Sequence, residues 1–181
     1  MPNRRWLDFL IILLISIAII PASALVYYAM ISSSSATMKA APVHFTAGND
    51  SSGILALGAN QTYAMLTLDA YPNVTLYYEQ AVNITAEADK EIRLRPVSIS
   101  PNNDPSVGNI TMVVFRLTKA DSTEAGVLTY TTTGNMWSVP ASTSYVSITS
   151  GETWAMKIEI TGAAGALGGV STDISIAIDV R

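Results

Sequence analysis

The chain has 181 residues, no cysteine and a single histidine, and its formal net charge is −4. The missing cysteines exclude a disulfide framework and a thiolate metal site, and His44 alone cannot build a His-Glu-x-x-His zinc protease. Only 13% of the residues are charged, and no basic cluster indicates binding to nucleic acid. We therefore expect no catalytic activity, no cofactor and no metal, and a surface rich in Ser, Thr, Asn and Gly.

The N-terminal segment predicts export from the cell. A short basic start, Asn3-Arg4-Arg5, precedes an almost entirely apolar run from Trp6 to Ile31. Small residues within the run, Ala22 and Ala24, fit the −3 and −1 positions of a signal-peptidase site. We therefore predict that residues 1–24 are a secretory signal peptide and that the protein is extracellular or on the cell surface.

The same run permits a second interpretation, because it continues past Ala24 to Ile31. An α-helix rises 1.5 Å per residue, so about 20 apolar residues span a bilayer, and an uncleaved segment would be a membrane anchor. Arg4 and Arg5 would then remain in the cytoplasm. The sequence leaves cleavage and retention open, and a membrane is an expected partner only if the segment is retained.

Residues 25–36 form an apolar segment followed by a hinge of four serines, Ser32–Ser35. Both faces of an extended segment over 25–31 are apolar, as in a strand that is buried on both sides. We predict that it adds to an open sheet edge of a neighbouring copy, as in donor-strand complementation, and that this head-to-tail contact produces a filament. The predicted donor residues are Leu25, Val26, Tyr27, Tyr28, Ala29, Met30 and Ile31.

Residues 37–181 are predicted to form one β-sandwich domain. Alternation of apolar and polar residues, with many Val, Ile, Thr and Tyr, predicts about eight strands: 62–69, 74–86 with a weak break near Glu79-Gln80, 91–99, 109–119, 127–133, 144–149, 152–161 and 172–180. Clusters of Gly, Asn and Pro between them are typical of turns. The pattern predicts an all-β fold, either a jelly roll or an Ig-like sandwich, preceded by the apolar N-terminal segment.

The triplet Asn-x-Ser/Thr, the acceptor sequence for N-linked glycan, occurs five times, in excess of chance. In an exported chain these positions are candidate sites for bulky, solubilising sugar. The candidate glycosylation residues are Asn49, Asn60, Asn73, Asn83 and Asn109.

The C-terminal part reads as Ser150–Ile160, then a Gly/Ala loop, then Ser171–Val180. Together with the signal peptide, the short hinge and the absence of cysteine, it resembles the TasA/camelysin-like secreted β-sandwiches, which include archaeal bundling pilins and thread-type filament subunits. The resemblance implies a jelly-roll subunit of an extracellular or biofilm fibre, a homopolymer joined by N-terminal donor strands, with lateral contacts between fibres. Camelysin is classed as a protease, but no residues here match a catalytic site, so that activity is not carried over.

Two other kinds of surface protein have an apolar N-terminus. A type IV pilin-like subunit retains its helix in the filament core, but its precursor is cut after a Lys/Arg-Gly-like step that Arg5-Trp6 does not match. A membrane-anchored adhesin or binding module is favoured if the helix is not cleaved. The main prediction is a structural subunit of a cell-surface pilus or biofilm fibre.

Overall fold

The computed structural model describes three stretches of the chain, residues 40–101, 109–166 and 170–181. The chain divides into two units between Lys39 and Ala40. All structural statements below concern the second unit.

The predicted signal peptide with Ala22 and Ala24, and the predicted donor segment 25–31, lie outside the described residues. Within the three described stretches, no helix has the length and apolar character needed to cross a membrane.

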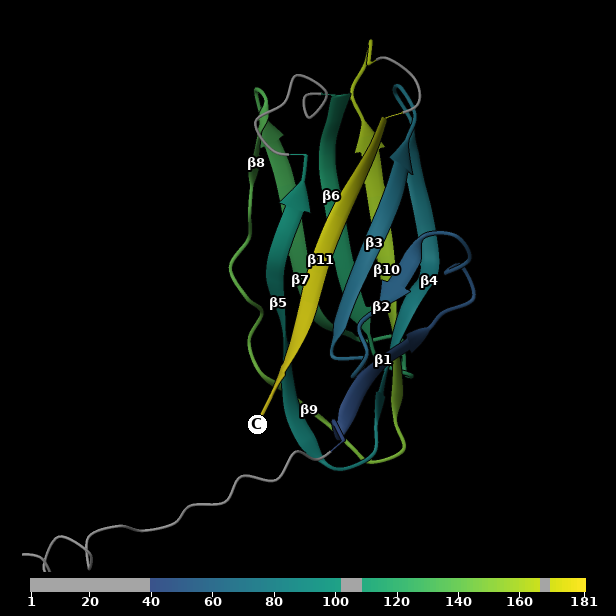
Figure 1. The fold of residues 1–181 in the computed structure, drawn as a ribbon, viewed down its shortest axis with the longest axis vertical. Helices are drawn as coiled ribbons and strands as arrows, with labels where there is room; N and C mark the ends of the chain where they lie inside the picture. The colour runs from purple at the N-terminus through teal and green to yellow at the C-terminus, as the bar shows by residue number, and fades with distance from the viewer. Residues whose placement is uncertain (1–39, 102–108, 167–169) are drawn as a thin grey trace, which may run out of the picture. The chain divides into compact units, whose positions relative to one another are not determined.

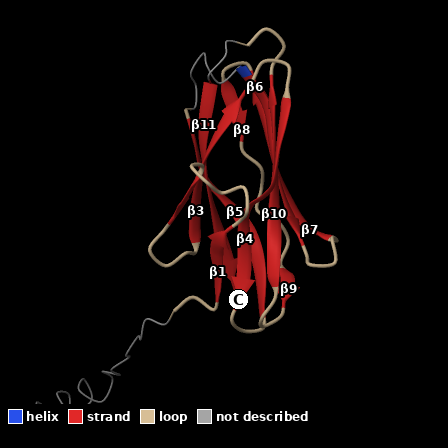
Figure 2. Cartoon of the chain, turned by 90° about the vertical axis from the view of Figure 1, so that its right-hand side faces the viewer, coloured by secondary structure: helices blue, strands red, loops and turns tan. Residues whose placement is uncertain are grey.

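The described residues form an all-β sandwich of two antiparallel sheets, seen edge-on in Figure 2. The strands are β1 (Val43–Ala47), β2 (Leu55–Leu57), β3 (Tyr63–Ala70), β4 (Thr75–Ala86), β5 (Lys90–Ser100), β6 (Ile110–Thr118), β7 (Glu124–Thr133), β8 (Met136–Ser138), β9 (Val146–Ile148), β10 (Thr153–Gly162) and β11 (Val170–Val180). One sheet has six strands in the order β1-β4-β10-β6-β7-β8, and the other has five in the order β2-β3-β11-β5-β9.

The strand pairing is nested along the chain. β6 pairs with β7, β5 with β9, β4 with β10, and β3 with β11. These eight strands are divided between the sheets as β4-β10-β6-β7 and β3-β11-β5-β9 (Figure 1), which is the jelly-roll arrangement. The predicted all-β sandwich is confirmed, and of the two expected topologies the pairing matches the jelly roll.

Alternate residues of the strands face inward and form the core between the sheets, as in β10. Its buried apolar side chains are Trp154, Met156, Ile158 and Ile160, each at most 1% exposed. Burying an apolar side chain of this size contributes roughly 1.5–3 kcal/mol, so two facing rows of such residues hold the sheets together. The alternation in 152–161 therefore correctly predicted which side of the strand faces inward.

The structure also contains strands that the sequence did not indicate. All eight predicted strands are present, and β1, β2 and β8 are additional, with five, three and three residues. Period-two alternation is hardly recognisable in so few residues. These short strands lie at the sheet edges, where they determine how much of each edge stays unpaired.

Candidate functional site

The two long sides of the sandwich are candidate assembly surfaces, because each exposes one edge of both sheets. One side is formed by β7 with β8 and by β5 with β9, and the other by β4 with β1 and by β3 with β2. Unpaired strand edges offer backbone N–H and C=O groups to another chain. The two sides differ in how fully the protein covers them.

The side formed by β5 and β7 is covered by the chain itself. Residues 139–145 run along it from β8 to β9 (Figure 1). The Thr143 N–H donates to the carbonyl oxygen of Leu94 at 3.0 Å, and the Thr143 Oγ1 accepts from the Leu94 N–H at 2.9 Å. The Thr143 side chain also lies against Gly126 of β7. This segment therefore links the two sheets and occupies backbone groups of β5.

The side formed by β3 and β4 is covered only over the half where the chain enters the sandwich. β1 pairs with Val82–Ala86 of β4, and β2 pairs with Ala64–Leu66 of β3. The Phe45 N–H donates to the carbonyl oxygen of Gln61 at 2.6 Å, which connects β1 to the turn before β3. Figure 2 faces this side of the molecule.

The part of β4 that is covered by β1 ends at Gln80, where the turn after β1 contacts the strand. The Asp50 N–H donates to the carbonyl oxygen of Gln80, and the Gln80 N–H donates to the Asp50 carboxylate, both at 3.0 Å. Gly48 lies so close that a methyl group there would overlap the Gln80 carbonyl. The register between β4 and β10 shifts here, between Met156 and Ile158. The weak break in the strand pattern is therefore a bulge that receives the turn.

Beyond this contact, no strand of the described residues pairs with the outer side of Thr75–Glu79 in β4, or with that of Leu68–Ala70 in β3. We call Thr75–Glu79 the open edge of β4. Two of its side chains, Leu76 and Tyr78, are half-buried and pack against the core. Burial, and secondarily the charge of Asp69, raise the pKa of Tyr78, so its hydroxyl remains protonated.

Apolar side chains gather around the open edge. Seven large hydrophobic residues are exposed in the described part of the chain, and three of them lie within 71–77. These are Tyr71, Val74 and Tyr77, which are 53%, 42% and 58% exposed. Sheet edges that remain unpaired usually carry several charged side chains. This edge has one, Glu79 at its end, and its apolar residues make it of the kind that accepts another strand.

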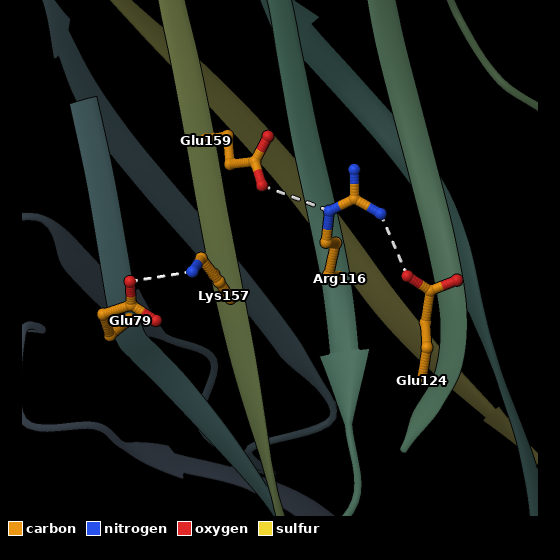
Figure 3. Close-up of polar contacts among 5 residues, drawn as sticks. All are labelled: Glu79, Arg116, Glu124, Lys157 and Glu159. Carbon is orange, nitrogen blue, oxygen red and sulfur yellow. Dashed lines mark hydrogen bonds and ion pairs between the residues drawn. The ribbon is translucent and has the colours of Figure 1, made fainter. Parts of the chain in front are cut away.

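The outer face of the six-stranded sheet is polar from Glu79, the last residue of the open edge, across to β7. Glu79 binds the Lys157 Nζ at 2.7 Å, and Arg116 joins Glu159 and Glu124 at 3.2 and 2.9 Å (Figure 3). The hydrogen bonds from Arg116 to the two carboxylates raise its pKa. Exposed pairs of this kind contribute about 0–1 kcal/mol each, so this face is a hydrated surface.

The five predicted glycan acceptors all lie in described residues, in two different settings. Asn49, Asn60 and Asn73 are exposed and lie in turns on the side formed by β1 to β4. Asn83 is half-buried within β4, between Thr46 of β1 and Ala155 of β10, and Asn109 is half-buried just before β6. The turn positions therefore have room for a bulky sugar, whereas Asn83 is enclosed by neighbouring strands.

The single histidine, the acidic side chains and a surface cavity are the remaining candidates for a binding or catalytic site. His44 lies half-buried in β1, opposite Thr85. In the three described stretches, no group of three or more His, Asp or Glu side chains is arranged to hold a metal. A surface cavity of about 410 Å³ at the start of β5 is lined by side chains of both charges, including Glu91 and Arg181, which pair with each other.

Comparisons with known proteins add little. No family model and no curated protein matches the chain. One similar solved structure is the cycloisomaltooligosaccharide glucanotransferase of a Paenibacillus species complexed with cycloisomaltoheptaose, with 17% identity and a TM-score of 0.20. The match covers 76% of this chain and 17% of that enzyme. So low a likeness carries no argument about function.

Proposed function

We propose that this protein is a structural subunit of an extracellular, cell-surface filament, a homopolymer assembled head-to-tail by N-terminal donor strands. The observation that supports the proposal is that the two ends of the sandwich differ. The chain enters at one end, and an apolar strand edge stays unpaired toward the opposite end. A subunit with a donor at one end and an acceptor at the other forms an open chain of copies.

The positions of the two ends follow from the register of β4. Where the chain enters, the Pro42 carbonyl oxygen accepts from the Glu87 N–H, and Val43 lies opposite Ala86, the last residue of β4. The open edge begins at Thr75, the first residue of β4. At about 3.3 Å per residue, these two points on β4 are roughly 36 Å apart. Stacked subunits would therefore bring the entering chain of one next to the open edge of another.

The proposal also accounts for the composition of the chain. The segment 25–31 has apolar side chains on both faces, and without cysteine the domain has no disulfide to stabilise it outside the cell. Docking the segment on a neighbour removes its own apolar surface and that of the open edge from water. Filament assembly then stabilises each subunit, and exposed acceptors such as Asn49 carry glycan on the filament surface.

Deletion of residues 25–31 tests the proposal. Full-length protein is expected to give fibres in negative-stain electron microscopy, while the deletion variant gives monomers. A matched control replaces Ser32–Ser35 by Gly-Ser-Gly-Ser, which keeps the donor segment and the hinge length, and this control is expected to polymerise. Fibres that persist in the deletion variant, or a full-length protein that stays monomeric at the cell surface, would contradict the proposal.

A further inference from the structure

We infer that the open edge of β4 is the acceptor, and that residues 25–31 of a neighbouring subunit add to it as an antiparallel strand. The inference rests on the proposed function and specifies the partner surface that the proposal leaves undefined. The partner that occupies this edge is the N-terminal segment of a second copy of the chain.

The other edges are either covered by the chain or shorter. β8 pairs only with Thr131–Thr133 of β7, and β9 pairs only with Lys90–Ile92 of β5, but residues 139–145 run along that side of the sandwich (Figure 1). On the β5 side, Thr143 already bonds to Leu94 on both its N–H and its carbonyl oxygen. On β3, the unpaired stretch Leu68–Ala70 has three residues, fewer than half of the seven in the donor segment. The open edge of β4 has five residues, and the turn that precedes it is exposed at Val74.

The side chains along the open edge fit a strand with two apolar faces. Leu76 and Tyr78 face the core, where they are half-buried, and Tyr77 lies on the outer face of the sheet with 58% of its surface exposed. A strand beside them would place one face over Leu76 and Tyr78 and the other beside Tyr77. A donor with a polar inner face would leave Leu76 and Tyr78 uncovered. On the outer face, an apolar donor residue would meet Tyr77 beside the Glu79–Lys157 pair.

The direction of the added strand follows from the two ends of the sandwich. A neighbour stacked on the end where β4 begins would extend its N-terminal segment along β4 from Thr75 toward Glu79, with Ile31 entering first and Leu25 reaching farthest. The segment then runs antiparallel to β4, which is the more stable pairing. The chain's own segment would approach from the other end, would pair in parallel, and would meet β1 and the turn at Asp50, which cover that part of β4.

The contact between Asp50 and Gln80 sets the register. Both backbone groups of Gln80 are occupied by Asp50, so an added strand stops at Glu79. If Leu25 lies opposite Glu79, then Tyr27 lies opposite Tyr77. Directly opposed residues of an antiparallel pair share one face, so Tyr27 and Tyr77 would meet on the outer side of the sheet.

Disulfide trapping tests this assignment, because the chain has no cysteine of its own. Tyr27→Cys and Tyr77→Cys are combined in the full-length chain, and isolated fibres are oxidised and run on non-reducing gels. The expected result is a ladder of covalent multimers that disappears on reduction. Tyr77 is exposed, so its substitution leaves the core intact. The matched control, Val26→Cys with Tyr77→Cys, places the donor cysteine on the opposite face, and no ladder is expected.

Two further pairs separate failure of the inference from failure of the proposed function. Tyr27→Cys is combined with Ala56→Cys on β2, or with Ser138→Cys on β8, both exposed. Fibres that crosslink through either of these positions, or that form without any ladder through Tyr77→Cys, overturn the acceptor assignment but leave the filament in place. A disulfide within a single chain overturns it as well. A wild-type chain that forms no fibres overturns the proposed function itself.

Discussion

Replacing Gly48 by Ala tests the contact that limits the open edge of β4. The backbone of Gly48 has a negative φ, so its conformation alone would tolerate alanine, but a methyl group would overlap the carbonyl of Gln80 and lie 3.1 Å from the carbonyl carbon of Ala81. The turn must move away, and the two hydrogen bonds between Asp50 and Gln80 are strained or lost. Each contributes about 0.5–1.5 kcal/mol, and forcing extra volume into a packed contact costs roughly 1–3 kcal/mol. The variant should lose about 2–6 kcal/mol of unfolding free energy.

Urea unfolding monitored by circular dichroism gives this difference. The matched control is Gly53→Ala in the same loop, where φ is +77° and nothing lies within 4 Å of an added methyl group. That change costs only the left-handed backbone penalty, about 1–2 kcal/mol. Suppose Gly48→Ala lowers the unfolding free energy no more than Gly53→Ala does. Then the turn does not pack on β4 as described, and the assignment of Glu79 as the end of the open edge is wrong.

Two further substitutions and one glycan measurement have defined outcomes. Tyr130→Phe should stabilise the protein by about 1–3 kcal/mol, because the Tyr130 hydroxyl is buried without a hydrogen-bond partner among the described residues. Burial raises the pKa of Tyr130, so the wild type, unlike the variant, should lose an added increment of stability as the pH rises above the unfolded tyrosine value near 10, measured by urea unfolding. Thr143→Val should cost about 1–3 kcal/mol and speed amide exchange at Leu94, whose N–H loses its acceptor. Peptide mass spectrometry should find glycan on Asn49 and none on Asn83; the reverse would refute the accessibility reasoning.

The sequence was sufficient to predict the fold class, because a long strand with one buried face has apolar and polar residues in alternation. In β10, Trp154 and Ile158 are buried as the alternation in 152–161 predicts. The short edge strands could not be predicted in this way, since three residues such as Leu55–Leu57 do not establish a period. Nor does local pattern determine which strands pair across the chain.

The open edge was not predictable for the same reason. Its position depends on what remains unpaired after every strand has found its neighbour, and on contacts between distant segments such as Gly48 and Gln80. The one local signal was the break in the pattern near Glu79-Gln80, where β4 bulges. The proposed donor segment, by contrast, could be singled out from the sequence, because it is an apolar run next to four serines.

The most direct test of the filament account is the N-terminal residue and intact mass of subunits from fibres sedimented from the cell surface. The account predicts a start at Leu25, with a mass above that of residues 25–181 by whole sugar units, because cleavage after Ala24 frees the donor segment. A start at Met1 or Pro2, in protein that is released from membranes only by detergent, would contradict it, since the segment would then remain in the bilayer. A start near Trp6 would also contradict it and would instead indicate a pilin-like subunit with a retained helix.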